Sequence, residues 1–234
     1  MQVVDVSVII PVFNGESYLA EAIESVLTQS IQPREIIVVD DGSSDASAMV
    51  ARRFSDRIQL HQQANRGAAA ARNRGIEISS GSFLAFLDAD DFWTPGKLDL
   101  QWQVLQNHPE QEMVLGNVVQ FISPDVDGLS RQRLRQELET MPAYLIGAML
   151  IRRGAFFKVG LLNEKLQLGE YIDWFQRGRD LGLSWHMLDE VVLKRRIHCS
   201  NQGITKRAHM ADYITVLKAA LDRKRRMHRE GRDK

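Results

Sequence analysis

The segment Phe83-Leu84-Ala85-Phe86-Leu87-Asp88-Ala89-Asp90-Asp91 is an apolar run that ends in three carboxylates within four positions. Apolar runs of this length are typical of buried strands in a sheet that is covered by helices. Further short apolar runs at 6–10, 35–39, 58–61 and 113–119 predict four more strands, and amphipathic stretches separate several of them. We therefore expect an α/β fold with a mainly parallel, Rossmann-like sheet and helices on both faces.

The stretches between these runs predict the helices. Leu19, Ile23 and Val26 share one helical face, and Asn14 stands where an N-cap is expected. A second helix is predicted over 67–78, and a third from Thr94-Pro95 to about Asn107. In the second half we expect a loop with a short helix over 122–139, a strand over 147–151, a helix over 171–181 and one or two strands over 184–193.

The length of 234 residues suits one α/β domain followed by a tail. Thirty basic and thirty acidic residues cancel, so no overall charge attracts the chain to nucleic acid, and none is expected as a partner. Residues 206–234 differ, because ten Lys and Arg residues there face four Asp and Glu residues. Met210, Ile214, Leu217 and Leu221 recur in this tail at helical spacing. This predicts a basic amphipathic helix that either packs on the domain or a second copy, or touches a membrane surface.

Cys199 is the one cysteine, so an intramolecular disulfide is excluded and a reducing compartment is expected. No apolar run reaches the roughly 18 residues of a membrane span, and the start lacks the layout of a signal peptide. We expect a cytoplasmic protein, with peripheral contact at the inner face of the membrane left open.

Polar and acidic residues follow three of the predicted strands. Ligands of open α/β sheets bind beyond the carboxyl ends of the strands, so these residues are expected to converge on one cleft. The segments are Pro11-Val12-Phe13-Asn14, Asp40-Asp41-Gly42-Ser43-Ser44-Asp45 and Asp88-Ala89-Asp90-Asp91.

Asp88 and Asp90 project to one side of an extended segment, with only the small Ala89 between them. Mg²⁺ or Mn²⁺ is typically held by one or two carboxylates, while substrate phosphates and waters supply the other ligands. The alternative is a solvated turn that caps the next helix. We favour a metal site, since a cation would relieve the repulsion among neighbouring carboxylates.

Asp40 and Asp41 fit two roles, because Asp-Gly and Ser-Ser are turn formers and a carboxylate at a strand end can also accept a hydrogen bond from a base. The segment 65–75 likewise allows two interpretations. It combines small residues at a helix start with a row of cations that includes Arg72, so it could hold phosphate. Alternatively, its alanines meet the sheet and its arginines are solvated.

Four motifs in this order resemble the family 2 glycosyltransferases: P-V-F-N-G, V-V-D-D-G-S-S-D, N-R-G-A-A-A-A-R-N-R-G and F-L-D-A-D-D, within residues 7 to about 97. The resemblance implies the A-type glycosyltransferase fold and transfer of a sugar from a nucleoside diphosphate, with UDP the expected nucleotide. It places Asp90 on the metal, Asp88 on the ribose or donor sugar and Arg72 on the nucleotide or its phosphates. The other predicted donor-site residues are Pro11, Phe13, Asn14, Asp40, Asp41, Asn65 and Ala89.

The second half departs from the family pattern at the expected catalytic base. Family members show adjacent Glu-Asp at a helix start, whereas this chain has Glu170-Tyr171, with Asp173 further on. Glu170 and Asp173 are both candidate bases, and an Asp173–Arg177 surface ion pair is the alternative for the latter. The segment Arg195-Arg196-Ile197-His198 resembles the family's closing R-x-H, which implies that His198 lies near the diphosphate or metal.

These observations predict an inverting transferase that uses Mn²⁺ or Mg²⁺ and acts on the hydroxyl of a saccharide or lipid-linked acceptor, in cell-surface polysaccharide or glycolipid synthesis. We expect residues 1–120 to bind the donor, residues 121–205 to supply the acceptor site and base, and residues 206–234 to form the tail. A non-catalytic relative that binds sugar nucleotides without a base is the alternative. The donor sugar, the acceptor and the oligomeric state, including a homodimer, stay open.

Overall fold

A computed structural model describes residues 2–126, 141–142, 144–199, 201 and 209–230, with side chains described up to residue 225. The strands are β1 Val3–Val12, β2 Gln32–Asp40, β3 Gln59–Gln62, β4 Phe83–Phe86, β5 Phe92–Trp93, β6 Met113–Ile122, β7 Met141–Pro142, β8 Leu150–Arg152 and β9 Trp185–Ile197. The helices are α1 Leu19–Leu27, α2 Ser47–Arg52, α3 Ala68–Ile78, α4 Lys97–Asn107, the 3₁₀ helix η2 Ile146–Ala148, α6 Arg153–Val159, α7 Glu170–Asp180 and α9 Ala211–Glu230. Most of the loop predicted over 122–139 lies outside the described residues.

One sheet in the order β3-β2-β1-β4-β8-β6-β9-β5 forms the centre of the molecule, and β7 pairs with β6. Strands β3, β2, β1 and β4 are parallel, whereas β8 pairs antiparallel with both β4 and β6. The predicted α/β fold is confirmed, and the sheet is mixed beyond β4.

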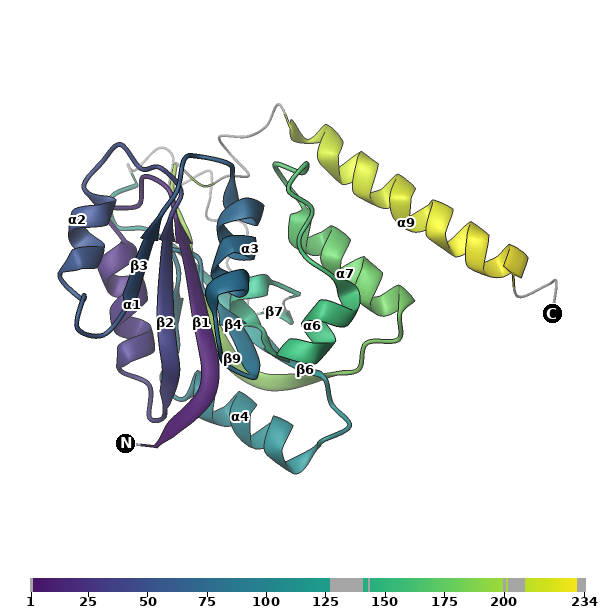
Figure 1. The fold of residues 1–234 in the computed structure, drawn as a ribbon, viewed down its shortest axis with the longest axis horizontal. Helices are drawn as coiled ribbons and strands as arrows, with labels where there is room; N and C mark the ends of the chain where they lie inside the picture. Colours follow the sequence, from purple (N-terminus) through teal and green to yellow (C-terminus); the bar gives the residue numbers. More distant parts are fainter. Residues whose placement is uncertain (1, 127–140, 143, 200, 202–208, 231–234) are drawn as a thin grey trace.

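Alternation along the strands explains why both faces of the sheet carry helices. Val8 and Ile10 pack in the core cluster that includes α1, while Ile9 between them faces the opposite side. Successive side chains of a strand point to opposite faces, so a continuous apolar run is needed where both faces are covered. Figure 1 shows α1 and α2 on one face and α3, α6 and α7 on the other.

The register brings the carboxyl ends of the parallel strands to one edge. Val12 of β1 lies opposite Asp40 of β2, and Asp40 lies opposite Gln62 of β3. Strand β4 joins them through the pairing of Phe86 with Ile9, just before Asp88. The segments after β1, β2 and β4 therefore meet, as the strand-end rule predicts.

Two predicted helix starts were wrong. Helix α1 begins at Leu19 with Tyr18 at the N-cap position, whereas Asn14 has a φ of 51° and its Oδ1 accepts a hydrogen bond from the Ser44 backbone N–H at 2.8 Å. Helix α4 begins at Lys97, because Gly96 adopts a left-handed conformation with a φ of 80°. The strand predicted over 147–151 is divided between η2 and β8.

Helix α9 confirms that the tail contains a helix, and it lies outside α7, away from the sheet (Figure 1). None of the helices in the described part of the chain has the length and apolarity that crossing a membrane requires.

Candidate functional site

Arg72 joins the two halves of the chain at the edge where the parallel strands end. Its guanidinium donates from Nη2 to Asp88 Oδ1 at 2.5 Å and from Nη1 to Glu170 Oε1 at 2.7 Å. Arg72 lies on α3, Asp88 follows β4, and Glu170 is the first residue of α7. The structure thus brings together a donor-site candidate from each of two motifs and a candidate base that lies about a hundred residues further along the chain.

The Arg72 guanidinium is buried, with a side-chain exposure of 6%. Burial by itself would lower its pKa, but the carboxylates of Asp88 and Glu170 outweigh burial and hold the pKa above its usual range. Its Nε is buried without a hydrogen-bond partner among the described residues. The result is a fixed cation that orients Asp88 and Glu170 toward a common point.

Asp90 meets the end of β9. Its Oδ2 lies 2.9 Å from His198 Nε2 and accepts a hydrogen bond from Asn201 Nδ2 at 3.2 Å. An octahedral ion that binds its ligands at about 2.0–2.1 Å separates two neighbouring ligands by roughly 2.9 Å. The oxygen and imidazole donors, at this spacing, fit two positions around Mg²⁺ or Mn²⁺. The described residues contain no group of three or more His, Cys, Asp or Glu side chains arranged to hold an ion.

Asp91, next in the chain, is buried. Its Oδ1 accepts the backbone N–H of Arg196 at 2.8 Å. Burial, and then the charges of Asp90 and Asp88, raise the pKa of the Asp91 carboxyl well above its ordinary value. The charges of Asp88 and Asp90 thus oppose a third charge on Asp91, and a cation bound beside them would relieve this repulsion.

Arg196 positions the acidic segment and was not singled out by the sequence. Its Nε donates to the carbonyl of Asp90 at 3.0 Å, and its Nη2 pairs with Glu21. The guanidinium lies over the rings of Tyr18 and Phe121, 4.6 and 4.7 Å from their centres. The sequence also did not single out Asn201, which donates to Asp90, or Tyr18, whose ring lies under Arg196. The resemblance of residues 196–198 to R-x-H was the available signal for Arg196, since nothing local to Asp90 indicates a partner about a hundred residues away.

At the other end of the site, Asp40 and Asp41 make the turn contacts that the sequence left open beside a ligand role. Asp40 is fully buried and accepts hydrogen bonds from the Ser43 backbone N–H and from Gln62 Nε2. Asp41 accepts the backbone N–H groups of Arg66 and Gly67, directly before α3, and also Gln63 Nε2. Both carboxylates thus shape the loops that follow β2 and β3.

The remaining predicted donor-site residues lie along the same edge. Phe13 is 53% exposed beyond the buried Pro11, and Asn14 ties the loop after β1 to the loop after β2 through Ser43 and Ser44. Asn65 is exposed, and its backbone nitrogen would lie 2.9 Å from a Cβ at Gly42. Ala89 packs against the core between Asp88 and Asp90.

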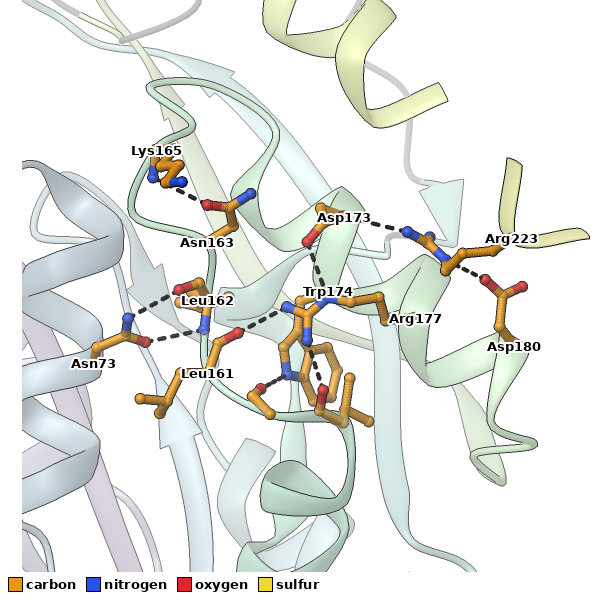
Figure 2. Close-up of polar contacts among 12 residues, drawn as sticks. Asn73, Leu161, Leu162, Asn163, Lys165, Asp173, Trp174, Arg177, Asp180 and Arg223 are labelled. Atoms are coloured by element: carbon orange, nitrogen blue, oxygen red, sulfur yellow. Dashed lines mark hydrogen bonds and ion pairs between the residues drawn. The ribbon is translucent and has the colours of Figure 1, made fainter. Parts of the chain in front are cut away.

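Asp173 is not brought to this edge. Its Oδ2 accepts a hydrogen bond from Arg177 Nε at 3.0 Å, and its Oδ1 lies 3.8 Å from Arg223 Nη1 (Figure 2). Arg177 in turn donates to the carbonyls of Val159 and Leu161. Asp173 thus forms the ion pair with Arg177 that the sequence offered as its alternative role, but Asp173 is buried and not on the surface as predicted.

Tyr171 occupies the position where family members have an acid, and its side chain points into the core. It is 6% exposed and stacks on Trp174, with the ring centres 6.0 Å apart. Since the first turn of α7 directs residue 170 toward Arg72 and residue 171 toward the core, an acid at position 171 would not face Asp88 in this arrangement.

Comparison with known proteins identifies the family of this chain. The model of the family described as glycosyl transferase family 2 matches residues 7–164. An uncharacterized glycosyltransferase of Rickettsia conorii is 33% identical over 227 residues, which cover 91% of this chain and 37% of the relative. One from Rickettsia typhi is 32% identical over 222 residues, covering 89% of this chain and 69% of the relative. The chain thus spans little more than a third of the first relative.

Solved structures share the fold. The crystal structure of S. aureus TarS 1-349 in complex with UDP superposes with a TM-score of 0.70 at 18% identity, covering 95% of this chain and 65% of that one. The same protein in complex with UDP-GlcNAc gives a TM-score of 0.72, also at 18% identity, with 95% and 66% covered. At this identity the likeness establishes the fold.

Proposed function

This chain belongs to glycosyl transferase family 2, and we propose that it transfers a sugar from a nucleoside diphosphate donor to an acceptor hydroxyl, with inversion and with the help of a divalent cation. The observation that carries the proposal is the Arg72 bridge, which holds Asp88 of the donor half beside Glu170 of the second half. Donor and acceptor chemistry need groups from both halves at one point, and proximity of this kind accelerates a reaction by fixing the partners in place.

The donor site uses the strand-end segments. In the proposal, Pro11, Phe13, Asn14, Asp40, Asp41 and Asn65 surround the nucleoside, and Asp88 and Ala89 face the ribose or sugar. Asp90 and His198 would hold Mn²⁺ or Mg²⁺, and the bound cation would offset the negative charge of the diphosphate. Arg196 and Asn201 keep Asp90 oriented toward this position. The complexes of TarS with UDP and with UDP-GlcNAc support a uridine diphosphate sugar as donor.

Glu170 is the proposed base. Its carboxylate, with 13% side-chain exposure, is held by Arg72 at the start of α7. In the displacement, the acceptor oxygen bonds to the anomeric carbon while the bond from that carbon to the diphosphate oxygen breaks. The hydroxyl proton passes to Glu170, and the bonding electrons leave with the nucleoside diphosphate. The proposed acceptor is a saccharide or a lipid-linked molecule.

Release of nucleoside diphosphate from a panel of UDP-sugars, with and without Mn²⁺, tests the proposal. A competent site leaks some sugar to water even without acceptor, so we expect slow, Mn²⁺-dependent UDP release from at least one donor. No release from any UDP-sugar, together with Mn²⁺-dependent UDP binding, would favour the non-catalytic relative instead.

The cation is tested separately with Asp90→Ala, which removes one member of the Asp90–His198 pair. Nearly all Mn²⁺-dependent UDP affinity should be lost. Asp99→Ala is the matched control, because Asp99 lies on α4 and accepts a hydrogen bond from the exposed Gln103. If Asp90→Ala binds UDP with Mn²⁺ as tightly as the wild type and the control, the assignment of the metal site is wrong.

A further inference from the structure

Helix α9 presents a stripe of large apolar side chains to solvent. Ile214, Leu217 and Leu221 are 69%, 61% and 55% exposed, and Met210 directly before the helix is 52% exposed. Their spacing of four, three and four residues places all of them on one side of a helix. Large apolar side chains gathered on one face in this way mark an interaction surface.

The opposite side of α9 is attached to the protein, so the direction of the apolar stripe is set. Asp212 Oδ2 accepts the backbone N–H groups of Gln167 and Leu168, and Val216 is buried. Arg223 Nε donates to Asp180 Oδ2 at 2.7 Å on α7 (Figure 2). These three residues recur at intervals of four and seven, on the face away from Ile214 and Leu217. The helix therefore cannot turn its stripe toward the domain without breaking these contacts.

Cations border the apolar stripe. On a helix of 100° per residue, Lys218 and Arg225 flank one edge of the stripe and Lys224 flanks the other, and all three side chains are exposed. Asp222 lies further round the helix, with Oδ1 3.5 Å from Arg225 Nη1. An apolar stripe between exposed cations is the pattern of a helix that lies in the plane of a lipid surface.

We propose that this face of α9, defined by Met210, Ile214, Leu217 and Leu221 with Lys218, Lys224 and Arg225, binds an anionic lipid bilayer surface. The apolar side chains enter the boundary between headgroups and acyl chains, and the cations contact lipid phosphates. A second copy of the chain is a poorer occupant. Two such faces laid against each other would bring cations of the same sign together around the apolar contact, which opposes association.

The packing of α9 also determines where the candidate base Glu170 would lie relative to a lipid surface. A Cβ at Gly169 would lie 3.2 Å from the ring of Tyr213, so the first turns of α9 stand beside the residue that precedes Glu170. A lipid-bound α9 thus holds the start of α7 close to the membrane. The lipid contact itself does not depend on the role of Glu170, so the two can fail separately.

Co-sedimentation of the full chain with vesicles tests the proposal. The protein should bind vesicles of phosphatidylglycerol and phosphatidylcholine far better than vesicles of phosphatidylcholine alone, and added salt should weaken the binding. Ile214→Ser with Leu217→Ser should lower the partition coefficient by about 30-fold, since two apolar side chains lose their insertion. Val3→Ser with Met49→Ser is the matched control, because those side chains are 65% and 57% exposed elsewhere on the protein.

The cations are tested by Lys218→Gln, Lys224→Gln and Arg225→Gln together, which should weaken binding to the anionic vesicles by about 100-fold. The control changes Arg34, Arg74 and Lys158 to Gln, three exposed cations on other elements. Equal sedimentation of the α9 variants and their controls overturns the proposal, and so does absence of binding by the wild type. A dimer in sedimentation equilibrium that Ile214→Ser with Leu217→Ser dissociates would assign the face to a second copy and also overturn it.

Discussion

Glu170 and Asp173 lie three residues apart on α7, yet their carboxylates have different partners. Glu170 is bound by Arg72, which also binds Asp88, whereas Asp173 is bound by Arg177 and Arg223. Glu170→Gln keeps the size and a hydrogen-bond acceptor but cannot take the proton, so transfer should fall by about 10²–10⁴-fold while UDP affinity holds. Steady-state rates and calorimetric UDP binding measure the two quantities.

Asp173→Asn is the companion variant on the same helix. Since Asp173 serves two arginines, the change should lower the free energy of unfolding by about 1–3 kcal/mol and leave the rate within about threefold of the wild type. Urea denaturation and the same rate assay distinguish the variants. The reverse pattern, with the rate lost in Asp173→Asn and kept in Glu170→Gln, would assign the base to Asp173.

Lys97 adds a prediction about pH. It is fully buried at the start of α4, donates to Gln101 Oε1 at 2.6 Å and lies 4.0 Å from the centre of the Trp93 ring. Burial lowers its pKa well below the ordinary 10.5. Between the two pKa values the unfolded chain binds more protons, so stability rises with pH there by up to about 1.4 kcal/mol per unit. That stability is complete above the unfolded pKa and is lost as the pH falls toward the folded pKa.

Lys97→Met should therefore flatten the dependence of the unfolding free energy on pH over this window. Urea denaturation at a series of pH values from 6 to about 10 measures it. Lys158→Met, at a side chain that is 49% exposed, should keep the wild-type slope. Parallel curves for the wild type and Lys97→Met would show that Lys97 does not titrate in this way.

Sequence patterns locate single residues well only where the information is local. Asp88 and Asp90 follow an apolar run and could be singled out without a structure. Asn201 and Arg196 reach Asp90 from 111 and 106 residues away, and no spacing in the sequence indicates those contacts. For the same reason the sequence could not decide whether Glu170 or Asp173 is the better candidate base. The two carboxylates differ in their partners, which come from α3 and α9.

At the scale of elements, the periodic patterns predicted most strands and helices of the first half, but they missed α2 and β5 and did not locate where each element begins. Strand β1 extends to Val3 and Val12, beyond the predicted 6–10, because its ends pair with β2. Gly96 delays α4 by its left-handed conformation, and Asn14 joins two loops instead of capping α1. Tertiary contacts of this kind override local preference at element ends, where it is weakest.

The packing of α3 on β1 gives a prediction about two glycines. A Cβ at Gly75 would lie 2.5 Å from Ile9 Cγ2, so α3 approaches the sheet more closely than a larger residue allows. Gly75→Ala should cost about 1–3 kcal/mol, even though alanine is the better helix former. Gly154→Ala on α6, where a Cβ would meet nothing within 4 Å, should instead stabilise by about 0.5–1 kcal/mol.

Urea denaturation of the two variants measures these opposite changes. Combining Gly75→Ala with Ile9→Ala should cost less than the sum of the single changes, because the space that the new methyl group needs is then open. Additive costs, or a Gly75→Ala protein as stable as the wild type, would contradict a close contact between Gly75 and Ile9 that limits the side chain at position 75.

At the scale of the whole molecule, the fold of the first half could be predicted from the sequence better than the fold of the second half. The first half follows a parallel β/α pattern, in which β1, β2 and β3 are neighbours both in the chain and in the sheet and β4 pairs with β1. In the second half, β8 inserts antiparallel between β4 and β6, and β9 spans thirteen residues along β6 before it reaches the site at His198. Such long-range pairings carry no local pattern, although they are what brings Arg196 and His198 to Asp90.

Because the predicted donor site draws on segments after β1, β2, β3 and β4 and on the end of β9, a bound nucleotide should stabilise the fold as one unit. A ligand at 100 times its dissociation constant adds about 2.7 kcal/mol to the free energy of unfolding. For a chain of this size each kcal/mol raises Tm by roughly 2–4 °C, so UDP with Mn²⁺ should raise Tm by about 5–10 °C. UDP without Mn²⁺ should give a smaller shift, because the cation that Asp90 and His198 would hold could then not offset the charge of the diphosphate. A thermal-shift panel of UDP, GDP and ADP, each with and without Mn²⁺, measures this, and Mn²⁺ alone is the control for direct effects of the ion. Equal shifts for all three nucleotides would contradict recognition of the uracil base, and no shift with any of them would contradict the donor site itself.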